Sequence, residues 1–182
     1  MDIKFVRARG RQDWVHVTRD DGSGLKWPWA KAGDQPPHDL MHFLIEGHLP
    51  LRNGFWDLVA DGVEFGFLSA EADRIARGVP PKGLAGRDLG GLVLAECVVA
   101  GISTATWVDA DDEQCLAWVD QQCRRRNLPR PDVLTAKTLL PVRARIREVV
   151  AAWRRLPLGE SLDVTYQPST GRRRPACTER VS

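Results

Sequence analysis

The sequence lacks the features that direct a chain into a membrane or out of the cell. The first residues, Met1 to Phe5, show no basic segment followed by an apolar run, so we expect no signal peptide. The longest apolar stretch, Leu92 to Ile102, is interrupted by Glu96 and is far too short to span a bilayer. These absences predict a cytoplasmic protein with no membrane partner.

Paired cysteines and several well-known catalytic signatures are also missing. The four cysteines form no CxxC pair and no regular framework, and scattered thiols are typical of a reducing cytosol: Cys97, Cys115, Cys123 and Cys177. The glycines at 83, 90 and 91 form neither a GxGxxG turn nor a P-loop, and no GxSxG motif is present. The sequence therefore gives no sign of a dinucleotide fold, a P-loop enzyme or a nucleophile elbow.

What is present is the composition of one globular domain. The chain has 182 residues, of which 43% are hydrophobic and 27% charged, which is enough for one core and too little for two. Arginine outnumbers lysine, which indicates a GC-rich bacterial genome. We expect a single domain over residues 1–167 and a disordered basic tail over 168–182, where apolar residues are sparse.

Alternating apolar and polar residues predict an N-terminal antiparallel meander. We expect its strands at Ile3 to Ala8, Trp14 to Thr18 and Leu25 to Trp29, and a last strand at Ser161 to Tyr166. Pro28 has no N–H to donate, so the third strand should lie at an edge of the sheet.

Helical spacing predicts several helices between these strands, and the fold class is therefore α+β. The expected segments are residues 36–48, a short apolar piece at 56–60, Ser69 to Arg77 with Ser69 as N-cap, Leu84 to Ala105, Asp109 to Arg126, and a helix starting near Pro141. A small antiparallel sheet packed with several helices is the predicted architecture.

The first helix carries a polar stripe. At 100° per residue, His38, Asp39, His42 and Glu46 share an arc about 100° wide, while apolar residues fill most of the remaining circumference. No lysine or arginine interrupts the stripe. The helix should therefore be buried on most sides, with its stripe facing either a narrow strip of water or an internal site.

The spacing of the two histidines favours a metal. Imidazoles at i and i+4 can reach one divalent ion, and His38-Asp39-Leu40-Met41-His42 resembles the HExxH motif of zinc metallopeptidases. The resemblance implies that His38 and His42 are ligands and that Asp39 is the base that activates water. Aspartate is one methylene shorter than the motif's glutamate. For the third ligand we consider Glu46 first, then the glutamates at 64 and 71, and we expect zinc.

A second resemblance covers most of the chain. Pro37-His38-Asp39-Leu40 with His42 and Glu46, followed by Gly54-Phe55-Trp56 and a closing Trp153 to Leu162 segment, resembles a group of short uncharacterised bacterial proteins with a PHDLxHxxxE helix. The resemblance implies one domain and no particular activity.

Structural roles explain the same residues equally well. Asp39 can stabilise the helix N-terminus, and His42 can pair with Glu46. Glu96, in the most apolar segment, must be paired or protonated if it is buried. We expect an arginine partner for it; if it faces the histidine stripe instead, it is a distant ligand or general base. Cys97 is expected to be a small core residue rather than a nucleophile.

These observations leave two functions open. The first is a metal-binding domain with a hydrolase-like site, in which Asp39 and Glu96 are catalytic and His38, His42 and Glu46 hold the metal. The alternative is a non-enzymatic module that binds an acidic protein or a nucleic acid. Its surfaces would be the tryptophans and the arginine-rich C-terminal part, which begins at the arginines 124–126.

Overall fold

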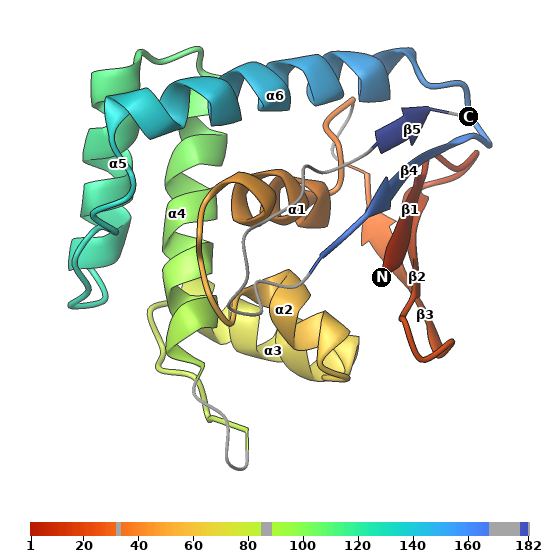
Figure 1. The fold of residues 1–182 in the computed structure, drawn as a ribbon, viewed down its shortest axis with the longest axis horizontal. Helices are drawn as coiled ribbons and strands as arrows, with labels where there is room; N and C mark the ends of the chain where they lie inside the picture. The colour runs from red at the N-terminus through yellow and green to blue at the C-terminus, as the bar shows by residue number, and fades with distance from the viewer. Residues whose placement is uncertain (32–33, 85–88, 168–178, 182) are drawn as a thin grey trace.

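An antiparallel sheet and six helices form the described part of the chain, which confirms the α+β class. The computed structural model describes residues 1–31, 34–84, 89–167 and 179–181. The strands are β1 (Asp2–Val6), β2 (Gln12–Thr18), β3 (Gly24–Ala30), β4 (Ser161–Thr165) and β5 (Glu179–Val181), in the order β3-β2-β1-β4-β5. Figure 1 shows the helices gathered on one side of this sheet.

Strand alternation buries one face of the sheet, as the sequence pattern predicts. Ile3 and Phe5 of β1 are fully buried together with Val15 of β2, whereas Lys4 lies on the other face and pairs with Asp163 of β4. β3 is an edge strand in the described sheet, so the position expected for a strand containing Pro28 is confirmed.

The helices are α1 (His38–His48), α2 (Phe55–Ala60), α3 (Phe65–Ala76), α4 (Gly90–Trp107), α5 (Asp112–Arg124) and α6 (Ala136–Arg155). α1 lies between the sheet and α4 and also packs against α2 and α6 (Figure 1). Its residues from Asp39 to Glu46 are all buried. The expectation that this helix is buried on most sides is therefore confirmed, and its polar stripe faces α4.

α4 is the central helix of the bundle. It is the one described helix that is long and apolar enough to cross a membrane, with a mean hydropathy of 1.4 over its 18 residues. Half of that segment is buried inside the fold, and Leu92, Val98 and Ile102 are fully buried against neighbouring elements. Core helices pass the same test of length and composition, and packing on several sides accounts for the apolar character of α4.

Two helix starts differ from the prediction. α3 begins at Phe65, with Glu64 in the N-cap position, five residues earlier than a Ser69 cap allows. Phe65 stacks on Trp27 with 4.2 Å between ring centroids, and this tertiary contact favours the earlier start. α6 begins after Thr135, whose side chain accepts from the Thr138 N–H in a capping box, so Pro141 lies inside the helix rather than at its start.

Three residues of the predicted tail form a short strand. Glu179–Val181 form β5 and pair with β4 in register, Leu162 opposite Val181. The open edge of β4 offers unpaired backbone groups to which an extended segment can bind. The other tail residues, 168–178 and 182, including Cys177, lie outside the described residues.

Candidate metal centre

The first helix places its polar stripe against Glu96 of α4. The His42 Nε2 atom lies 3.4 Å from Glu96 Oε1, and the His38 Nε2 atom lies 3.9 Å from Glu96 Oε2. The candidate ligand atoms of His38, His42 and Glu96 all lie within 4.8 Å of one another, so this group could hold a metal ion. His42 is 1% exposed, Glu96 13% and His38 37%, so the cluster runs from the core to the surface.

Glu46 fixes the orientation of the His42 ring. Its Oε1 atom lies 2.8 Å from His42 Nδ1 and accepts the Phe55 N–H at 3.0 Å, while its Oε2 accepts the Trp56 N–H at 3.0 Å. The carboxylate is thus held by the first residues of α2, where helical N–H groups have no partner within the helix. With Nδ1 bound to Glu46, the other ring nitrogen, Nε2, is the one that faces Glu96.

Gly54 gives Glu46 the room it needs. A Cβ built on Gly54 would lie 2.7 Å from the Glu46 carboxyl carbon and 2.7 Å from its Oε2. The Gly54 backbone, at φ −72° and ψ −172°, is open to any residue. The glycine is therefore required for space beside the carboxylate and not for backbone conformation.

Asp39 anchors the start of α1 to the sheet and to α2. Its Oδ2 accepts the Trp27 indole N–H at 2.7 Å, and its backbone carbonyl accepts the Trp56 indole N–H at 3.0 Å. Burial raises the pKa of the Asp39 carboxyl, and the Trp27 hydrogen bond and nearby histidines oppose this only in part. The predicted base therefore lies beside the cluster, with one oxygen already occupied by an indole.

The electrostatics of the cluster are dominated by His42 between two carboxylates. Burial alone would lower the pKa of His42, but the charge of Glu96 and the hydrogen bonds that Glu46 and Glu96 accept from the ring outweigh it and raise that pKa to about 10. Burial opposes ionisation of Glu96, yet the charges and hydrogen bonds of His42 and His38 hold its pKa well below the usual value. The two carboxyl groups around His42 thus favour its protonated form in the metal-free protein.

A cavity of about 310 Å³ opens beside the cluster. It is lined by residues of β3, α1, α2, α3 and α4: Trp29, His38, Asp39, His42, Phe55, Phe65, Ser69, Ala72, Asp73, Ala76 and Glu96. Two of the three candidate ligands are largely buried, while the cavity leaves one side of the cluster accessible to a small molecule. Sites with an open side are those that do chemistry, whereas structural metal sites are closed.

Of the residues named from the sequence, the structure joins some and separates others. Glu46 contacts His42 from the side opposite Glu96, so it supports a ligand and does not itself belong to the convergent group. Glu71 lies elsewhere, with its carboxylate accepting the Lys82 N–H, and Glu64 is not part of the cavity wall. Glu96 is paired with histidines, so the expectation of an arginine partner is wrong.

Sequence reasoning missed the α3 wall of the cavity. Ser69, Ala72, Asp73 and Ala76 follow the i, i+3, i+4, i+7 spacing of one helical face, and they all line the cavity. The signal was available as a stripe of small residues that contains one carboxylate. The predicted helix, Ser69 to Arg77, contains all four positions, but the elements that this face meets are set by packing between helices, which local spacing does not specify.

Cys97, the neighbour of Glu96, faces the other way. Its Sγ atom lies 3.5 Å from the Gln122 carbonyl of α5, and the side chain is 1% exposed. Adjacent residues on a helix point about 100° apart, so Glu96 lines the cavity while Cys97 lies in the α4–α5 interface. Cys97 is therefore a small buried residue, as expected, and it is not placed at the cavity as a nucleophile.

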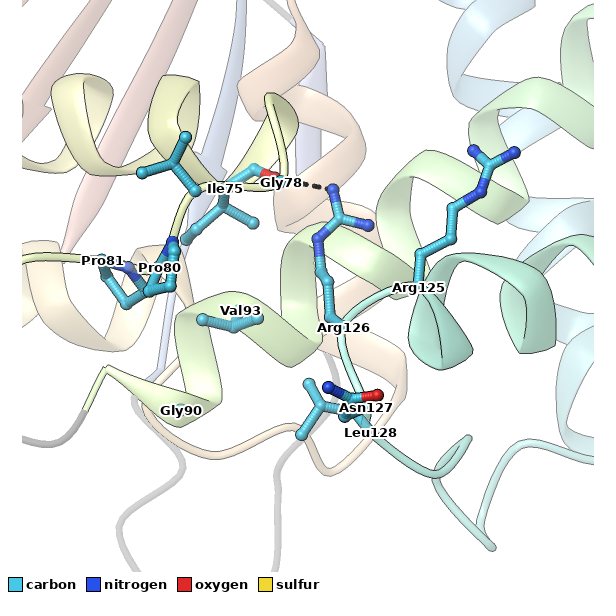
Figure 2. A pocket seen from close by; sticks show the side chains of 11 residues that line it. Ile75, Gly78, Pro80, Pro81, Gly90, Val93, Arg125, Arg126, Asn127 and Leu128 are labelled. Carbon is cyan, nitrogen blue, oxygen red and sulfur yellow. Dashed lines mark hydrogen bonds between the residues drawn. The ribbon is translucent and has the colours of Figure 1, made fainter.

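A second pocket, of about 350 Å³, lies between α3, α4 and the end of α5 (Figure 2). Its walls are mostly apolar, and the Arg126 guanidinium at its edge donates to the Ile75 carbonyl at 2.7 Å. No Asp, Glu, His or Cys lines this pocket among the described residues. It therefore lacks the acid–base and metal-binding groups of the α1–α4 cavity.

Some side chains of the arginine-rich C-terminal part already make contacts within the fold. Arg143 of α6 is 4% exposed and donates to the Asp112 carboxylate and to the Ala110 carbonyl, both in the acidic segment that precedes and begins α5. Arg145 pairs with Glu148. Arg124 and Arg125 are exposed, and the arginines at 172–174 lie outside the described residues. Binding of nucleic acid or of an acidic protein stays a prediction.

No protein-family description, curated protein or solved structure matches this chain. The residues of the site are thus the basis for assigning a function.

Proposed function

We propose that this protein binds a divalent metal through His38, His42 and Glu96 and uses it for hydrolysis of a small substrate. The observation that carries the proposal is the arrangement of His42, whose Nδ1 is bound by a buried glutamate while its Nε2 faces Glu96 at 3.4 Å. Metal-binding histidines almost always have this support, because a carboxylate on the far nitrogen fixes the ring and raises its basicity.

Distances support the same proposal. Ligand atoms about 2.1 Å from a tetrahedral ion stand about 3.4 Å apart. The His42–Glu96 distance has this value, and the separation of at most 4.8 Å within the group closes by rotation of the half-exposed His38 side chain. Two nitrogens and one carboxylate oxygen form a donor set that suits zinc, with a fourth position open toward the cavity.

Charge also favours a cation. Glu46 and Glu96 place two buried carboxyl groups against the single ring of His42. Buried charges are normally balanced, and a divalent ion that displaces the His42 proton supplies the balance. When bound, such an ion lowers the pKa of a coordinated water toward neutrality, which is the usual route to hydrolysis. Asp39 lines the same cavity as the proposed base, or as the group that orients the attacking water.

Zinc titration of the purified protein, followed by calorimetry and metal analysis, tests the proposal. We expect near-stoichiometric binding in the wild type and at least about a 100-fold loss of affinity in His42→Ala or Glu96→Gln, because removal of one ligand or its support has effects of this size. His16→Ala is the control, since His16 is exposed on β2 and away from the cavity. Stoichiometric binding that survives both site variants, or no binding at all, refutes the proposal.

We also propose that the protein works in the cytoplasm. Cys97, Cys115 and Cys123 are free and buried, which supports a reducing compartment.

A further inference from the structure

The cavity beside the cluster has a chemical character of its own. Aromatic rings of Trp29, Phe55 and Phe65 lie on one part of its wall, and the small-residue face of α3 lies on another. Trp29 is stacked on His38, with ring planes 18° apart and centroids at 6.1 Å. Flat apolar surfaces of this kind accept a flat apolar group, and 310 Å³ is at the small end of ligand sites.

Its charges are of one sign apart from the histidines. Asp39, Asp73 and Glu96 line the cavity, whereas no lysine or arginine does so among its described lining residues. Asp73 is exposed and has no ion-pair partner in the described part of the chain. Its side chain lines the cavity from α3, so it is available to a ligand.

We propose that the cavity takes a small organic cation, a flat apolar or aromatic group that carries an amine, with the amine placed at Asp73 and the apolar group against Trp29, Phe55 and Phe65. A carboxylate attracts an ammonium group through its charge, and aromatic faces attract the same group through cation–π interactions. Anionic compounds such as phosphate esters meet the carboxyl groups of Asp39, Asp73 and Glu96, and apart from the two histidines no basic side chain lines the described cavity wall. The placement of the reacting bond at His38, His42 and Glu96 rests on the proposed function.

A matched series of probes tests the charge preference. 2-Phenylethylamine, 2-phenylethanol and 3-phenylpropanoate have similar aromatic bodies and charges of +1, 0 and −1. Binding to the zinc-loaded protein and to chelator-treated protein is measured by ligand-observed NMR. We expect the amine to bind about fivefold more tightly than the alcohol, the upper range for one partly exposed ion pair, and the propanoate to bind most weakly to the chelator-treated protein.

Asp73→Asn should remove the difference between amine and alcohol, while Asp132→Asn, an exposed aspartate in the α5–α6 loop, should leave it unchanged. Ala72→Leu narrows the cavity from its α3 side and should weaken the binding of all three probes. Thermal melts check that this variant is folded. Equal or tighter binding of the propanoate to the chelator-treated protein overturns the inference, and so does an amine preference that survives Asp73→Asn. Zinc binding without a charge preference refutes this inference alone. A charge preference without zinc binding refutes the proposed function and leaves the amine site standing.

Discussion

Gly54→Ala is the sharpest perturbation of the cluster, because it acts on His42 through Glu46 without replacing any titratable residue. The new methyl group would lie 2.7 Å from the Glu46 carboxyl carbon, where ordinary contacts are 3.4–4 Å. Glu46 is fully buried and cannot turn toward solvent. Its carboxylate must therefore move by roughly 1 Å to restore a normal carbon–carbon separation. This movement takes it away from the two N–H groups of α2 from which it accepts hydrogen bonds.

The magnitude follows from the contacts that are displaced. Overpacking a core costs about 1–3 kcal/mol, and each weakened hydrogen bond to an ionised group costs about 1.5–3 kcal/mol when fully lost. Alanine suits the backbone of residue 54, and small shifts of α2 relieve part of the contact. We expect the free energy of unfolding to fall by about 2–4 kcal/mol. The pKa of His42 should fall as well, because Glu46 no longer holds its Nδ1.

Urea unfolding gives the stability, and NMR titration of the His42 ring gives the pKa. Gly66→Ala is the matched control: Gly66 lies in the first turn of α3, and a Cβ there meets nothing within 4 Å. This variant should keep or gain stability, by at most about 1 kcal/mol. A Gly54→Ala protein with wild-type stability and an unchanged His42 pKa would show that the Glu46 carboxylate is not held where the structure places it.

Three further outcomes follow from the same contacts. In metal-free protein, the stability from the raised His42 pKa is fully present below the unfolded value of 6.5 and lost as the pH rises through about 10. The stability from the lowered Glu96 pKa is present above its unfolded value of 4.5 and lost as the pH falls. The urea midpoint should therefore be highest between the two unfolded values, pH 4.5 for Glu96 and pH 6.5 for His42. Glu96→Gln should flatten the alkaline loss, and a slope that stays unchanged would mean that Glu96 does not charge His42. Gly101→Ala places a methyl group 2.6 Å from Val119 Cγ2 at the α4–α5 interface and should destabilise by about 1–3 kcal/mol, with unchanged zinc affinity as the check that the effect is confined to packing. Zinc affinity in the wild type should rise with pH across the neutral range, because the ion displaces the His42 proton; isothermal titrations in buffers of different ionisation enthalpy measure that release, and an affinity independent of pH contradicts it.

Local periodicity predicted the part of the site that lies on one element. The 100° advance of a helix brings His38 to His42 and His42 to Glu46 whatever the rest of the chain does, so the stripe and the His42–Glu46 contact follow from the sequence. The sheet was predictable for the same reason, since alternation marks its strands and Pro28 marks its edge.

Contacts between elements could not be predicted in this way. Glu96 meets His42 because α1 packs on α4, and nothing in either segment specifies that the buried carboxylate pairs with a histidine rather than an arginine. The role of Glu46 depends on Gly54 and on the start of α2, which lie outside its own helix. The start of α3 was misplaced because stacking of Phe65 on Trp27 outweighs the capping preference of Ser69.

The position of β1 in the sheet has a consequence for how the chain folds. One neighbour of β1 is the adjacent strand β2, but the other is β4, with Asp2 opposite Thr165. During synthesis this second edge stays unpaired until nearly the whole described chain has been made. The helices that form the cavity can associate earlier, because their contacts are closer in sequence. A nascent chain that stops before residue 161 thus exposes the backbone groups of Ile3 and Phe5 as an open template, and shortened forms of the protein should aggregate through this edge.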